Sequence, residues 1–211
     1  MVGLIVLLAA CGNSSNESTE SYTYRKVELP LGDKVTLGKS STHEIVFIFD
    51  YSCPWCKKWM ATVLPEIESR WLKTEEAMYK GQPLVLLNEQ SQLLANVDYN
   101  VERIAPHLYY DVQRQIGSDA GVIEDFGTED YVRRLAERFT LDPEQLLRTT
   151  GIDAGIQNAR HYTRDLGVEY VPTVYVDGIK LLDPFSLEEI EHVMTGKIRD
   201  GDQIDVVKTS E

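Results

Sequence analysis

The spacing of apolar residues changes along this chain, and its first part predicts two strands with a helix between them. Residues 45–49 are all β-branched or aromatic, which predicts a strand buried on both faces. A helix is predicted from Pro54 to about Leu72, because apolar residues recur there at every fourth position, namely Trp59, Val63, Ile67 and Trp71. Pro65 should kink or break this helix. A second buried strand is predicted at residues 84–87, after Gly81-Gln82-Pro83.

Residues 90–166 contain no convincing strand pattern and several helix signals. One predicted helix begins at Thr128 and places three apolar residues on one face, Val132, Leu135 and Phe139. Asp142-Pro143-Glu144-Gln145 has the N-cap, proline and glutamine pattern of a second helix start. A third helix is predicted through Ile152, Ile156 and Ala159, with Gly167 placed to end it.

The strand pattern returns near the end of the chain. Residues 173–176 and 179–182 flank Asp177-Gly178, which is a strong signal for a two-residue hairpin turn. Ser186-Leu187-Glu188-Glu189 has the pattern of a capping box and predicts a final helix. A short leading strand and a turn at Gly32-Asp33 are expected between residues 22 and 42. Strand, helix, strand, helical block, hairpin and helix together predict an α/β chain with a thioredoxin-like fold.

Composition narrows the class of partner. The chain has 211 residues, of which 43% are hydrophobic and 26% charged, as in an ordinary globular protein. Its formal net charge of -13 argues against a nucleic-acid partner, because a phosphate backbone attracts positive charge.

The N-terminus predicts export and a lipid anchor. Residues 2–10 carry no charge but are too few to span a membrane. Leu8-Ala9-Ala10-Cys11 resembles the lipobox of bacterial lipoproteins, which implies a cut before Cys11 and a diacylglyceryl group on its sulfur. The polar residues that follow predict a flexible tether. No Lys or Arg precedes the apolar run, so either the natural start lies upstream or the segment only mimics a signal peptide; a buried or disordered tail is the alternative.

Cysteine usage points to redox chemistry. Besides Cys11 the chain has only Cys53 and Cys56, so no cysteines remain for further structural disulfides. The four histidines show no paired metal-ligand spacing, and we predict no metal and no cofactor beyond the Cys53–Cys56 pair itself.

A CxxC segment between a strand and a helix has a physical rationale. Cys53 would lie at the helix N-terminus, where free backbone N–H groups and the helix dipole stabilise a thiolate. Cys56 lies one turn later, within reach of Cys53. Cys53 is therefore the predicted nucleophile and Cys56 the resolving thiol, with Pro54 presetting the first helical turn. The alternative is a purely structural disulfide.

Pro172 is the third predicted catalytic residue. In a thioredoxin-like fold, the residue that opens the hairpin strand is a cis-proline packed against the CxxC, and Val171-Pro172-Thr173 stands at that place. The backbone of Val171 could then pair with an extended substrate peptide. An ordinary trans-proline at a strand start is the alternative.

Two segments together resemble the DsbA-type thiol-disulfide oxidoreductases: residues 49–58 resemble that family's active-site segment, and residues 165–178 its cis-proline segment. About 115 residues separate Cys56 from Pro172, which matches the family's inserted helical domain. The resemblance implies a thioredoxin-like domain at residues 25–89 and 167–196 with a helical insertion at 90–166. Residues 1–10 are then the signal peptide, 11–24 the lipidated cysteine and tether, and 197–211 a polar tail.

The chain departs from the family at two positions. Phe47 stands where the family often has a buried acidic residue, so Glu44 or Asp50 would have to replace it, and both also fit ordinary polar roles. Trp55 is unusual inside the motif; it either joins Pro54 and Val171 in the substrate surface or packs on the adjacent helix.

Three functions follow from these observations. The first is an oxidase that donates its disulfide to thiols of unfolded or exported proteins. The second is an extracytoplasmic reductase or isomerase. The third is a peptide-binding or chaperone-like lipoprotein with a vestigial CxxC. All three place the protein on the outer side of a bacterial membrane, and the first two require a membrane redox partner of unknown identity.

Overall fold

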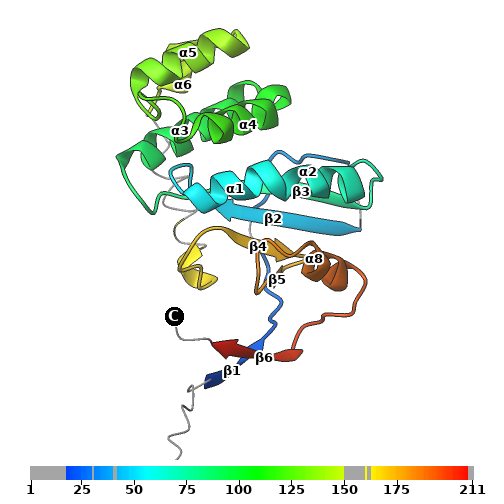
Figure 1. Ribbon diagram of the computed structural model, residues 1–211. Helices are drawn as coiled ribbons and strands as arrows, with labels where there is room; N and C mark the ends of the chain where they lie inside the picture. The colour runs from blue at the N-terminus through cyan, green and yellow to red at the C-terminus, as the bar shows by residue number, and fades with distance from the viewer. Residues whose placement is uncertain (1–17, 30, 40–41, 150–159, 161–162, 209–211) are drawn as a thin grey trace, which may run out of the picture. The chain divides into compact units, whose positions relative to one another are not determined.

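The computed structural model describes residues 18–29, 31–39, 42–149, 160 and 163–208 (Figure 1). The chain divides into two units. The larger spans Tyr24–Asp202, and the described part of the smaller joins residues 18–23 to residues 203–208.

Four strands form the central sheet of the larger unit, in the order β3-β2-β4-β5. Strand β2 (His43–Phe49) pairs in parallel with β3 (Ala77–Pro83) and antiparallel with β4 (Thr173–Val176). Strand β5 (Ile179–Lys180) pairs antiparallel with β4 at the sheet edge. The predicted strand buried on both faces is confirmed, because residues 45–49 are all buried.

Successive side chains of β2 enter two packing layers, as the alternation of a strand requires. On one face Phe47 stacks on Trp59, with 3.8 Å between ring centroids, and on Phe49 at 5.0 Å. On the other face Val46 and Ile48 join an apolar cluster with Leu84, Val168 and Tyr175. Both layers bury apolar surface, which fixes the strand that leads to Cys53.

The helix after the CxxC segment is broken at the predicted place. It consists of α1 (Pro54–Thr62), α2 (Leu64–Ile67) and a π-helical turn η1 (Glu68–Leu72). Pro65 lies in the first turn of α2, where its missing N–H is tolerated, whereas α1 could not run through it. The expected apolar face is buried by Trp59, Val63, Ile67 and Trp71.

The prediction of the second strand was wrong. Strand β3 covers Ala77–Pro83, and the apolar run 84–87 lies outside the sheet. The backbone N–H groups of Leu86 and Leu87 donate to the Asp50 carboxylate and not to the backbone of a neighbouring strand. The side chains of both residues are exposed. Strand β3 alternates buried and half-buried residues, many of them polar or small, so its sequence lacks a continuous apolar run.

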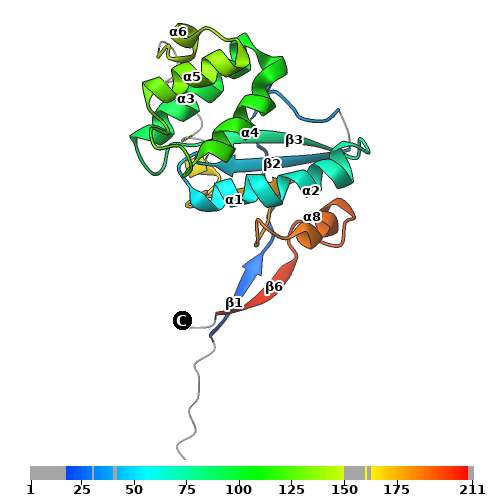
Figure 2. The same ribbon diagram turned by 45° about the horizontal axis from the view of Figure 1, so that its top comes forward.

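The inserted block is helical, as predicted. It contains α3 (Glu89–Ile104), the 3-10 turn η2 (Pro106–Leu108), α4 (Tyr109–Asp119), α5 (Glu129–Phe139) and α6 (Pro143–Leu146), which Figures 1 and 2 show grouped together. Thr128 and Asp142 cap α5 and α6 as expected, accepting hydrogen bonds from Tyr131 N–H and Glu144 N–H. The predicted helix through Ile152, Ile156 and Ala159 lies outside the described residues.

The C-terminal hairpin and helix of this unit also follow the sequence, except that the second hairpin strand, predicted over residues 179–182, covers only Ile179–Lys180. Asp177 and Gly178 have φ values of 50° and 82°, the left-handed pair that a tight hairpin turn requires. Helix α8 (Leu187–Met194) begins after Ser186, whose hydroxyl accepts from the Glu189 N–H. The capping box is only half formed, because the Glu189 carboxylate instead accepts hydrogen bonds from the backbone N–H groups of Leu182 and Asp183.

The smaller unit contradicts two expectations. Residues 18–23, placed in a flexible tether, form strand β1 (Ser18–Thr23), and residues 203–208, placed in a polar tail, form strand β6 (Gln203–Lys208). The two strands pair antiparallel, from Ser18 opposite Lys208 to Thr23 opposite Gln203. Backbone hydrogen bonds between distant segments produce this pair, and neither segment has an apolar run that indicates it.

The larger unit thus confirms the predicted α/β, thioredoxin-like fold with an inserted helical block. Among the described residues, no helix combines the length and apolarity needed to cross a bilayer.

Candidate active site

Cys53 lies where the turn after β2 becomes helix α1. Its backbone N–H donates to the Asp50 carbonyl at 3.0 Å, and its carbonyl accepts from Lys57 N–H at 3.1 Å. Cys53 is therefore the N-cap residue of α1, and Pro54 occupies the first helical turn, as the sequence predicts. This position exposes the thiol sulfur to the free N–H groups of the first turn, where negative charge is stabilised.

The buried carboxylate of Asp50 holds this turn in shape. Its Oδ1 accepts hydrogen bonds from Ser52 N–H at 2.8 Å and from the Ser91 hydroxyl at 2.5 Å. Its Oδ2 accepts from Leu86 N–H at 2.8 Å and Leu87 N–H at 3.1 Å. Four donors therefore fix both oxygens, and Asp50 joins the active-site turn to helix α3 and to the chain after β3.

Glu44, the other acidic candidate, is not near the cysteines along its strand. It lies at the start of β2, whereas Cys53 follows the end of that strand. Its carboxylate forms an ion pair with Lys80 at 2.8 Å. Phe47, which lies between Glu44 and Asp50 in the sequence, is fully buried and stacks on Trp59.

The two cysteines are free, buried thiols with opposite pKa shifts. The pKa of Cys53 is lowered to about 6. A hydrogen bond from the Cys56 thiol is the main cause, the backbone N–H groups of Cys56 and Trp55 contribute in the same direction, and burial opposes them. Burial raises the pKa of Cys56 far above that of an ordinary thiol, and its hydrogen bond to Cys53 adds to this. Cys53 is therefore the thiol that ionises more easily, and Cys56 is the one that keeps its proton.

The segment before β4 meets the cysteines, although about 115 residues separate the two in sequence. The Val171-Pro172 peptide bond is cis, as expected from the motif. The Cys53 sulfur lies 3.7 Å from the Val171 carbonyl oxygen, to which the protonated thiol donates. The structure therefore brings Cys53, Cys56, Val171 and Pro172 together at one end of the sheet.

Trp55 and Pro54 lie at the surface. The Trp55 side chain is 58% exposed. Its ring makes an edge contact with Phe185 at 6.2 Å, and the Lys58 ammonium lies 5.0 Å from its centroid. Phe185 is a neighbour of the motif that the sequence reasoning missed.

A cavity of about 310 Å³ opens beside Cys53. The turn and first helical residues line one part of it, and residues of the helical block line the rest: Tyr51, Ser52, Cys53, Pro54, Lys57, Asn88, Gln90, Ala120, Gly121 and Phe126. The Lys57 ammonium donates to the Ala120 carbonyl across this cavity. An open cavity thus adjoins Cys53.

A buried polar cluster lies behind the active-site turn and was not predicted from the sequence. Asp98 of α3 accepts hydrogen bonds from the hydroxyls of Tyr51 at 2.5 Å and Tyr109 at 2.7 Å, and from Gln113 at 3.2 Å. Burial raises the pKa of Asp98, partly offset by the nearby Lys34 ammonium. Tyr51 precedes Cys53 by two residues, so this cluster joins the helical block to the active-site turn.

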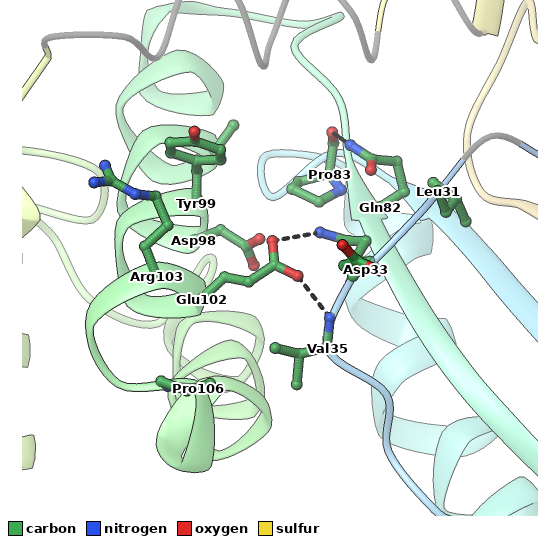
Figure 3. A pocket seen from close by; sticks show the side chains of 12 residues that line it. Leu31, Asp33, Val35, Gln82, Pro83, Asp98, Tyr99, Glu102, Arg103 and Pro106 are labelled. Atoms are coloured by element: carbon green, nitrogen blue, oxygen red, sulfur yellow. Dashed lines mark hydrogen bonds and ion pairs between the residues drawn. The ribbon is translucent and has the colours of Figure 1, made fainter. Parts of the chain in front are cut away.

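Asp98 also borders a second cavity of about 500 Å³, shown in Figure 3. Across this cavity Glu102 binds the Lys34 ammonium at 3.1 Å and the Val35 N–H at 2.8 Å. One sequence signal could have indicated the cluster, because Asp98 occupies the same helical face as the buried Leu94 and Val101. A charged residue on an apolar face requires buried partners.

No metal site emerges from the side chains. Within the described ranges, no group of three or more His, Cys, Asp or Glu residues is arranged to hold a metal ion. Cys11, the predicted lipidation site, lies outside the described residues. The chemistry available at this site is that of the two thiols, which can cycle between a dithiol and a disulfide.

The thioredoxin-like proteins have a CxxC pair at a helix N-terminus and a cis-proline segment beside it, at one end of a mixed sheet. The family model described as thioredoxin matches residues 31–195. The chain belongs to this family.

Several solved structures share this fold. Oxidised BdbD from Bacillus subtilis is 18% identical, with a TM-score of 0.76 over 83% of this chain and 98% of that one. DsbA from Chlamydia trachomatis is 19% identical, with a TM-score of 0.68 over 79% and 92%. The thiol-disulfide exchange protein alpha-DsbA2 from Wolbachia pipientis is 19% identical, with a TM-score of 0.63 over 78% and 87%. A search of curated proteins finds no match.

Proposed function

We propose that the protein is a disulfide oxidase that donates the Cys53–Cys56 disulfide to thiols of exported proteins. A substrate thiolate attacks the Cys53 sulfur, which breaks the Cys53–Cys56 bond, forms a mixed disulfide and releases Cys56 as a thiolate that takes up a proton lost by the substrate thiol. A second substrate thiolate then attacks the substrate sulfur of the mixed disulfide, so that the substrate leaves as a disulfide and Cys53 leaves as a thiolate. Two electrons pass from the substrate to the cysteine pair, and a membrane partner re-oxidises the pair.

The observation that carries this proposal is the opposite pKa shift of the two thiols. A Cys53 thiolate with a pKa near 6 is a good leaving group and a stable product of the reaction. Stabilising that thiolate stabilises the reduced protein relative to its disulfide. The disulfide is therefore a stronger oxidant than one between two ordinary thiols, as an oxidase requires.

Trapping of mixed disulfides tests the roles of the two cysteines. In the Cys56→Ala variant the resolving thiol is missing, so Cys53 should accumulate mixed disulfides with substrate proteins on non-reducing gels. Cys53→Ala is the matched control and should accumulate none. Adducts in the Cys53→Ala variant would reverse the assignment, and turnover that survives in both variants would support a vestigial CxxC.

We propose further that the protein is exported and anchored to the outer face of the membrane through a lipid on Cys11. The lipobox-like segment before Cys11 supports this placement. The full chain should then enter the detergent phase on phase separation, and Cys11→Ser should move it to the aqueous phase. A wild-type chain found wholly in the aqueous phase, with its first residues uncleaved, would contradict the anchor.

A further inference from the structure

We propose that Lys58 is a specificity-determining residue that favours substrates with an acidic side chain next to the reacting cysteine. The inference rests on the exchange reaction proposed at Cys53 and adds the class of substrate that the site prefers. It is carried by a surface made of Trp55, Lys58 and Phe185, which we call the aromatic ledge.

The aromatic ledge holds an ammonium group against two rings. The Lys58 Nζ lies 5.0 Å from the centroid of Trp55 and 5.6 Å from that of Phe185. The two rings meet edge to face, with an interplanar angle of 77°. Attraction between a cation and aromatic rings restrains the flexible lysine side chain in this place. None of the three residues lines the cavity beside Cys53, so the ledge is a separate surface of the active site.

The backbone under Phe185 is fixed by contacts to two helices. The indole N–H of Trp59, in α1, donates to the Pro184 carbonyl at 2.7 Å. Asp183 accepts from Phe185 N–H at 2.9 Å, and Glu189 of α8 accepts from Asp183 N–H at 3.0 Å. The ledge is therefore preformed, and a substrate that binds there does not need to order it.

The charge of Lys58 is available to a ligand. Lys58 is exposed, and in the part of the chain that the structure describes no carboxylate lies within ion-pair distance of its ammonium. Two acidic side chains of the neighbouring segments are engaged elsewhere: Asp50 accepts from four donors, and Asp183 accepts from Phe185 N–H. The neighbouring Lys57 is held by the Ala120 carbonyl.

An acidic residue beside the substrate cysteine fits this arrangement. The substrate sulfur must reach Cys53, which is two residues from Trp55, so the adjoining substrate side chains pass over the exposed indole. A carboxylate there can pair with Lys58 while its stem packs on the rings. The whole chain carries a formal net charge of -13, which disfavours acidic peptides elsewhere on its surface, so this local cation is where they gain attraction.

A single exchange step measures this preference without a redox partner. The Cys56→Ser protein is mixed with peptides whose only cysteine is linked to thionitrobenzoate; the Cys53 thiolate attacks the peptide sulfur, forms a stable mixed disulfide and releases coloured thionitrobenzoate. The peptides are identical except for Glu, Gln or Lys beside the cysteine. We expect the Glu peptide to react about threefold faster than the Gln peptide, the effect of one exposed ion pair, and the Lys peptide to react more slowly.

Lys58→Gln should make the Glu and Gln peptides react equally, and Lys58→Arg should keep the preference. The exposed Lys73, which lies outside the ledge, is the matched control, and Lys73→Gln should keep the preference too.

The preference for the Glu peptide should shrink in high salt. It should appear as a lower peptide concentration at half-maximal rate. A Glu preference that persists in Lys58→Gln, or is absent in the Cys56→Ser protein itself, would overturn the inference. Failure of every peptide to react with Cys53 would instead overturn the proposed function.

Discussion

At the scale of single residues, the site depends on one difference between two chemically identical side chains. Cys53 lies at a helix N-terminus and accepts a hydrogen bond from Cys56, whereas Cys56 is buried inside the first turn. With a pKa of about 6, roughly nine in ten Cys53 thiols are ionised at pH 7. The thiolate is thus present under physiological conditions without a separate general base.

Titration of the thiolate by ultraviolet absorbance checks this assignment. The reduced protein should show one thiolate step with an apparent pKa of about 6. Cys53→Ser should remove the step. Cys56→Ala should raise the pKa because it removes the largest favourable contact, while Cys56→Ser, whose hydroxyl can still donate, should raise it less. A step that survives in Cys53→Ser, or no step below pH 8, would contradict the assignment.

The same shift predicts how stability depends on pH. The pKa of Cys53 is lower in the folded dithiol form than in the unfolded chain, so its contribution is fully present above the unfolded value of about 9 and is lost as the pH falls through about 6. The free energy of unfolding of the reduced protein should therefore fall, relative to that of the oxidised protein, from pH 9 to pH 6. Denaturant curves of both forms measure this. An unchanged difference would refute the prediction.

At the scale of elements, regular patterns were predictable and long-range supports were not. The continuous apolar run of β2 and the two left-handed residues of the hairpin turn depend on local sequence, and both were predicted. The prediction of a strand at residues 84–87 was wrong because the backbone N–H groups of Leu86 and Leu87 donate to a buried carboxylate and not to a neighbouring strand. Sequence spacing does not report such a distant acceptor.

Replacement of Asp50 tests that account. Asp50→Asn keeps the shape of the side chain but replaces one carboxylate oxygen with an NH2 group, which then faces N–H or O–H donors. We therefore expect a loss of about 3 kcal/mol in the free energy of unfolding. Ser91→Ala removes one of the four donors and should cost about 1 kcal/mol. Urea denaturation of the reduced proteins compares the two. Equal, small losses would show that Asp50 does not anchor the turn.

At the scale of the whole molecule, the sequence indicated the reactive groups and the structure supplied their surroundings. Cys53, Cys56 and Pro172 were identified because each belongs to a short motif. Phe185 and the Asp98 cluster were missed because their contacts join segments far apart in the chain. Strands β1 and β6 were missed for the same reason, since their pairing joins the two ends of the described chain.

The reduction potential of the Cys53–Cys56 pair tests the central claim most directly. The protein is equilibrated with glutathione buffers of known potential at pH 7, and the reduced fraction is measured. A Cys53 pKa of about 6 lies about one unit below the thioredoxin value of about 7, which corresponds to about 30 mV. We therefore expect a pair more oxidising than thioredoxin, with a potential of about -240 mV or higher. A potential near the thioredoxin value of about -270 mV would contradict the oxidase and favour the reductase.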